Sequence, residues 1–136
     1  MALDVGVADA EDNGLLPSPR AALENDGYYW FLHTLFQGLR NSHGKYIDLH
    51  GDTKFRRSEL SLLDHLLNDA TGLVREQPAR WRVHVGKQTV RTQAGPSERE
   101  LYSEVDRREF LDLIARLRGI VAVARETGSS VWFIGD

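Results

Sequence analysis

Apolar residues recur at helical spacing in three stretches of the chain, at residues 26–42, 58–74 and 106–127. In the third stretch Asp106 and Glu109 have the spacing of a capping box. Each stretch also starts beside a residue that can cap free N–H groups, and glycines follow the first and third. The pattern therefore predicts three amphipathic helices, whose apolar sides face one core.

A second pattern, alternation with a period of two, predicts short strands. Residues 81–85 and 88–92 flank Gly86-Lys87, a pair typical of a two-residue hairpin turn. Residues 100–105 form a weaker strand candidate. Residues 45–50 also alternate, whereas residues 131–134 are apolar on both faces, which favours a strand in the middle of the sheet.

Residues 1–22 contain several acids, glycines and prolines without a periodic apolar pattern, which predicts a flexible acidic tail. Residues 23–136 then form a single α+β domain. We expect three amphipathic helices packed on a mixed four- to five-stranded sheet.

Composition narrows the class of protein. The 136 residues include no cysteine, which excludes disulfides and thiolate metal sites. The first residues lack the pattern of a signal peptide, and no apolar run is long enough to span a bilayer. We therefore expect a cytoplasmic protein that does not contact membranes.

Charge is distributed unevenly along the chain. The formal net charge is −3, but residues 1–26 carry −5 and residues 27–136 carry +2. A local excess of +4 lies at residues 75–91, where a basic ribbon could enter a nucleic-acid groove. Because this patch is short and Trp81 shares the core side of its strand with Val83 and Val85, nucleic-acid binding is the weakest of three interpretations.

Trp30 is the most informative single residue, because it lies opposite the core stripe of its helix. An exposed tryptophan is typical of an interface. The alternative is that another element covers it as a second core layer. The predicted partner-binding set, which also allows a homodimer, consists of Trp30, Thr34, Gln37, Arg82, His84 and Arg91.

Two polar groups could bind a small ligand. Asp48, His50 and Asp52 could converge at the end of the strand predicted at 45–50, and such a ligand set suits a divalent metal. The spacing is loose, so we assign no metal ligands or cofactor. A second group precedes a helix start and could bind an anion: Lys54, Arg56 and Arg57.

No catalytic residue is assigned, because the chain has neither a Gly-x-Ser-x-Gly motif nor a dinucleotide fingerprint. The segments at 46–52, 78–86 and 131–136, together with the last helix, resemble small bacterial α+β proteins. Many of these are immunity proteins of polymorphic and contact-dependent toxin systems. The resemblance implies a cytoplasmic inhibitor that binds and blocks one toxin, with no functional residues carried over. The alternative function is a small-molecule or metal-dependent site around Asp48, His50 and Asp52.

Overall fold

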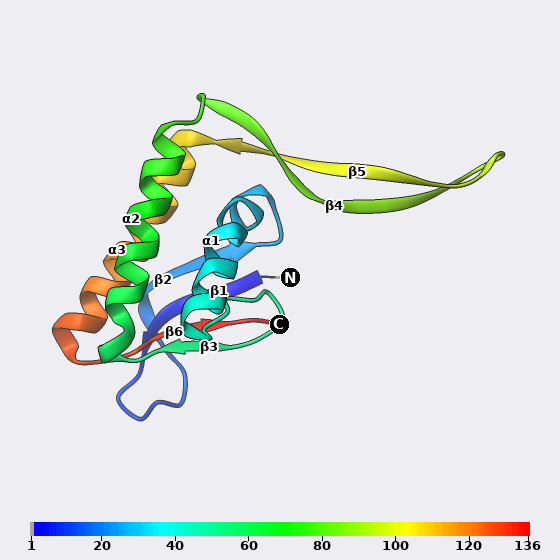
Figure 1. Cartoon of the computed structure of the whole chain (residues 1–136). Helices are drawn as coiled ribbons and strands as arrows, with labels where there is room; N and C mark the ends of the chain where they lie inside the picture. The colour runs from blue at the N-terminus through cyan, green and yellow to red at the C-terminus, as the bar shows by residue number, and fades with distance from the viewer. Residues whose placement is uncertain (1) are drawn as a thin grey trace.

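The computed structural model describes residues 2–136, and these form an α+β fold with three helices and six strands in two sheets (Figure 1). In chain order the elements are β1 (Ala2–Ala8), β2 (Leu15–Glu24), α1 (Gly27–His43), β3 (Thr53–Phe55), a 3-10 turn (Arg57–Glu59), α2 (Leu60–Arg75), β4 (Arg80–Thr92), β5 (Gly95–Asp106), α3 (Arg107–Thr127) and β6 (Val131–Ile134). The α+β class and the three helices are confirmed.

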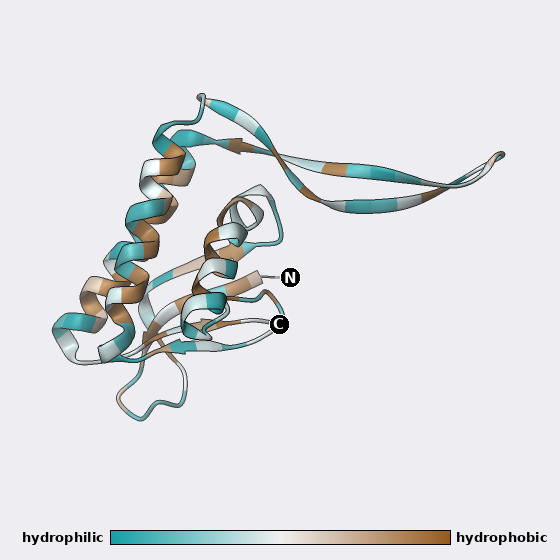
Figure 2. Ribbon diagram, in the orientation of Figure 1, coloured by the Kyte–Doolittle hydropathy of each residue, from teal (hydrophilic) through white to brown (hydrophobic). Residues whose placement is uncertain are grey.

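The larger sheet has four strands in the order β2-β1-β6-β3, and every neighbouring pair is antiparallel. The predicted mixed sheet of four to five strands is therefore not what forms. One face of the sheet packs against the helices, and its alternating residues are buried (Figure 2). The central row of this face, in register across all four strands, is Ala21, Val5, Phe133 and Thr53, with Leu3, Leu23, Val7, Val131 and Phe55 in the neighbouring rows.

The N-terminal segment corrects the prediction of a flexible tail at residues 1–22. Residues 2–8 and 15–24 instead form β1 and β2, and β1 lies in the middle of the sheet. Leu3, Val5 and Val7 are each no more than 1% exposed. The two prolines that argued against order lie on β2, an edge strand, where a missing N–H donor is tolerated.

At the other end of the chain, β6 confirms the strand predicted at residues 131–134 and its central position. Val131 and Phe133 are buried, while Trp132 and Ile134 face the opposite side and are only partly covered. The strand predicted at residues 45–50 does not form. That segment is irregular, and β3 forms three residues further on, at Thr53–Phe55.

Two of the three helices begin and end at capping residues that the sequence offers. The cap expected at the start of the second helix does not form, because α2 begins after Glu59, which makes no side-chain cap hydrogen bond. Asp26 accepts a hydrogen bond from the Tyr28 N–H at the start of α1, and Asp106 accepts one from the Glu109 N–H at the start of α3. Gly44 and Gly128 end these two helices with positive φ angles of 71° and 66°. None of the helices in residues 2–136 is sufficiently long and apolar to span a membrane.

The second sheet is a ribbon of two long strands, β4 and β5, paired from Arg80↔Asp106 to Thr92↔Gly95. The hairpin turn predicted at Gly86-Lys87 is wrong, because β4 continues through these residues and the chain turns after Thr92. Gly86 instead occupies a register shift beside Val85, with a φ angle of +155° that favours glycine. The weak strand predicted at residues 100–105 is the inner part of β5.

Candidate protein-binding site

The inner end of the ribbon is anchored in the hydrophobic core. The Trp81 ring stacks on Phe110 of α3 at 6.2 Å and meets Phe31 of α1 edge-on at 5.5 Å, measured between ring centroids. Val105 is fully buried against the start of α1. The helices therefore hold the direction of the ribbon at its base.

The outer part of the ribbon has no such support. Figure 1 shows the ribbon leaving the helices and extending well beyond α1 and the sheet. Residues 87–94 and 96–100 are all exposed. A two-stranded ribbon is marginally stable by itself, and both of its strands leave backbone groups unpaired along their outer edges. This part of the chain is therefore the one most available to another molecule.

Pairing and pleat divide the ribbon into two faces. Trp81, Val83, Leu101 and Val105 lie on the face that turns toward the helices near the base. The other side, which we call the outer face, is exposed along its length. The outer face carries Arg82, His84, Lys87, Thr89 and Arg91 of β4 and Glu98, Glu100, Tyr102 and Glu104 of β5.

Tyr102 is the centre of the outer face. Its side chain is 50% exposed, the His84 ring lies edge-on 5.4 Å away, and the Arg82 guanidinium lies over it at 4.5 Å from the centroid. The His84 imidazole also contacts the Glu100 carboxylate. Tyrosine and arginine are typical hot-spot residues, so this cluster has the chemistry of a protein-binding surface.

The structure thus brings together two residues of the predicted partner-binding set, Arg82 and His84, while Arg91 lies further out on the same face. Tyr102 was not among the predicted partner-binding residues. The sequence does indicate that Tyr102 is exposed. It lies two residues from both Glu100 and Glu104, so all three side chains share one face if residues 100–105 form a strand.

Cross-strand ion pairs balance the charge of the ribbon. Lys87 contacts Glu98 and Glu100 at 3.6 and 3.7 Å, and Arg80 lies 3.9 Å from Glu104. With five basic and four acidic residues at 80–106, the net formal charge is +1. The excess of +4 that suggested nucleic acid is offset by β5, which leaves a mixed-charge surface suited to a specific protein partner.

Trp30 is half-buried rather than free on the surface. Its indole N–H donates to the Asn25 side chain at 2.8 Å, and its ring packs edge-on against Tyr29 at 5.2 Å. The His33 ring also packs against Trp30, with 4.9 Å between the ring centroids. Burial lowers the pKa of the His33 imidazole. Thr34 and Gln37, the other two residues of the predicted partner-binding set on α1, are exposed.

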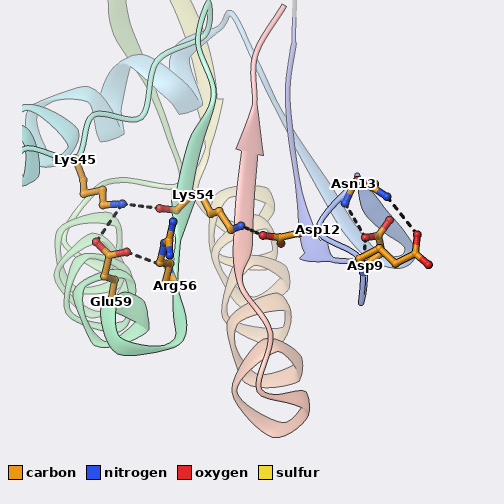
Figure 3. Close-up of polar contacts among 8 residues, drawn as sticks. Asp9, Asp12, Asn13, Lys45, Lys54, Arg56 and Glu59 are labelled. Carbon is orange, nitrogen blue, oxygen red and sulfur yellow. Dashed lines mark hydrogen bonds and ion pairs between the residues drawn. The ribbon is translucent and has the colours of Figure 1, made fainter.

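The predicted anion-binding residues do not form a common pocket in the described structure. The Lys54 ammonium pairs with Asp12 (Figure 3). It also lies over the Trp132 ring, 4.9 Å from its centroid. Arg56 donates its backbone N–H to Glu59 at 3.1 Å, and Arg57 begins a 3-10 turn of only three residues. Lys54 is therefore occupied by a carboxylate of the chain itself.

Of the residues suggested as ligands, Asp48 and Asp52 accept hydrogen bonds from backbone N–H groups. Asp48 accepts a hydrogen bond from the His50 N–H at 3.2 Å, and Asp52 accepts one from the Gly135 N–H at 3.1 Å. Within residues 2–136, no group of three or more histidine or acidic side chains is arranged to hold a metal ion. In this arrangement Asp52 fastens the C-terminal segment to the loop before β3.

Comparison of the chain with protein-family models, with curated proteins and with solved structures finds no match.

Proposed function

We propose that the chain is a protein-binding module that presents the outer face of the β4–β5 ribbon, centred on Tyr102, to one partner protein. The projecting ribbon with its exposed Tyr102 cluster is the observation that carries this proposal. Its base is anchored by core aromatic residues, so the arm is oriented before binding and loses less freedom on association.

The partner class follows from the resemblance noted in the sequence. We propose an immunity-type inhibitor that neutralises a bacterial toxin by covering its active site. A ribbon is narrow enough to enter a cleft, and its two exposed edges can add hydrogen bonds to a strand of the toxin. The alternating charges of the outer face would select one toxin over others, because a wrong partner brings like charges together.

Growth rescue tests this function. Where a gene beside that of this chain encodes a large secreted protein, the chain is co-expressed with the C-terminal domain of that protein, next to an empty-vector control and a chain carrying Tyr102→Ala. We expect growth with the original chain and impaired rescue with Tyr102→Ala. If the original folded chain fails to restore growth, the assignment as inhibitor of that toxin is wrong.

A further inference from the structure

The two strands of the ribbon carry opposite charge. Residues 80–92 contain four basic and no acidic residues, whereas residues 95–106 contain four acidic residues and one basic residue. The formal charge is therefore +4 for β4 and −3 for β5. Because this sheet has only these two strands, each of them leaves one edge without a neighbouring strand. The two edges therefore differ in the kind of strand that each accepts.

Pro96 fixes which backbone groups of β4 point away from β5. Arg91 lies opposite Pro96, which has no N–H, so this pair cannot exchange both hydrogen bonds of the ladder. Hydrogen-bonded and non-hydrogen-bonded pairs alternate in an antiparallel ladder, and the register is regular over residues 86–92. Lys87, Thr89 and Arg91 therefore direct their N–H and C=O groups to the free edge of β4.

Two of these three residues also place a positive charge beside the edge. Residues 87–92 are exposed, and Figure 1 shows that the outer part of β4 lies beyond the helices. Lys87 contacts two acids of β5, but its side chain is still 57% exposed. Within residues 2–136, no acidic side chain forms an ion pair with Arg91. Because a guanidinium keeps its charge at neutral pH, this edge attracts carboxylates.

A second copy of the chain does not fit this edge. Two β4 edges in contact would bring cations next to cations. The β5 edge of a second copy carries Pro96, which cannot donate a backbone hydrogen bond. The neighbouring acids Glu98 and Glu100 already contact Lys87 of their own chain. The strand that fits the β4 edge therefore belongs to a different protein.

We propose that the β4 edge at residues 87–91 binds an extended acidic segment of the partner protein, which adds as an antiparallel strand. Side chains directly opposite each other share one face, so two carboxylates four residues apart meet Lys87 and Arg91. On the other face an apolar side chain of the segment adjoins Val90, which is 36% exposed. This edge extends the surface centred on Tyr102, and the assignment rests on the proposed function.

A synthetic peptide tests the edge without the toxin. The peptide has two glutamates separated by valine, threonine and valine, with a threonine at each end. We expect the full chain to bind it with a Kd below about 1 mM and not to bind a peptide with lysine in place of both glutamates. Amide exchange should slow at Lys87, Thr89 and Arg91 but not at Gln88 and Val90, which already pair with β5. Charge attraction alone would not produce this alternation.

Two variants of the chain separate charge from backbone pairing. Arg91→Glu should weaken binding about tenfold or more, and a peptide with lysine in place of the glutamate opposite it should restore binding. Arg99→Glu makes the same charge change on the inner face of β5 and is the matched control. Thr89→Pro removes an outward N–H and should abolish the slower exchange, because proline is tolerated on an edge. Arg91→Glu decides the outcome if Thr89→Pro disturbs the ribbon.

The proposal is overturned if the glutamate peptide does not bind, if the lysine peptide binds equally well, or if Arg91→Glu changes nothing. If the peptide binds as expected but the toxin domain does not bind, the proposed function is wrong and the strand site stands. If the toxin domain depends on Tyr102 but the peptide does not bind, the strand site is wrong and the proposed function stands.

Discussion

A Cβ atom on Gly27 would lie 2.5 Å from Cγ2 of Val105, so the first residue of α1 and the inner end of β5 are in direct contact. This contact joins the ribbon to the helices, and the backbone oxygen of Ser103 lies only 3.1 Å from the same point. No side chain larger than hydrogen fits there without moving the ribbon or the helix.

Gly27→Ala should therefore lower the free energy of unfolding by about 1–3 kcal/mol, the usual effect of overpacking a filled core. Urea denaturation measures it. Gly119→Ala on α3 is the control, because a Cβ there meets no atom within 4 Å and should stabilise the helix by up to about 1 kcal/mol. Equal effects of the two substitutions would show that α1 and β5 are not in contact.

Leu3→Ala tests whether the N-terminal segment belongs to the core. Leu3 is completely buried in β1, so its truncation should destabilise the chain by about 2–5 kcal/mol in chemical denaturation. The exposed Glu11 between β1 and β2 offers a control, where Glu11→Gln should change stability by no more than about 0.5 kcal/mol. If Leu3→Ala is as harmless as Glu11→Gln, residues 2–8 are a tail after all.

The three helices were predictable because each has a one-sided apolar pattern, and α1 and α3 also begin at a capping residue. The N-terminal strands were not predictable, because Gly6 interrupts the apolar pattern of residues 2–8, and Pro17 and Pro19 are residues that usually end a strand. Only the pairing of β1 with β6, from opposite ends of the chain, shows that its apolar residues complete the core. Such long-range pairing leaves little trace in a single sequence.

The candidate site likewise contains residues that could be predicted from the sequence and residues that could not. Arg82 and His84 could be placed on an exposed strand face by alternation alone, and the structure agrees. Their neighbour Tyr102 comes from β5, whose pairing with β4 depends on a register shift at Gly86 and on a turn beyond Thr92. The outer part of the ribbon, beyond Gly86, has no buried face, so no apolar alternation marks its length or its turn.

Asp52→Ala tests the structural role of a residue that the sequence also suggested as a ligand. The Gly135 N–H donates both to the Asp52 carboxylate and to the Gly51 carbonyl, each at 3.1 Å, so the substitution should lower the free energy of unfolding by no more than about 1 kcal/mol, measurable by urea denaturation. Titration of the original chain with Zn²⁺ or Mn²⁺ should show no stoichiometric binding. Stoichiometric binding that Asp52→Ala removes would favour the metal-dependent alternative.

His33 makes the stability of the chain depend on pH. Burial lowers the pKa of its imidazole below the ordinary value of 6.5, so the unfolded chain takes up a proton before the folded chain does. The free energy of unfolding should therefore fall as the pH drops below about 6.5 and recover as it rises.

The pH dependence is measured by urea denaturation at a series of pH values, and His33→Gln should reduce its slope between pH 7 and 5.5. Thr34→Ala, at the exposed neighbouring position, should leave the slope unchanged. An identical slope in the His33→Gln chain would mean that other groups cause the dependence.

Binding of the purified toxin domain, measured by titration calorimetry, tests the central claim most directly. Tyr102→Ala should raise the Kd about 30-fold or more, as expected for a hot spot of about 2 kcal/mol, with little change in stability because the ring is half exposed. Gln88→Ala, on the opposite face of the ribbon, should bind like the original chain. Equal affinity of the Tyr102→Ala chain and the original chain would contradict the assignment of the outer face as the binding surface.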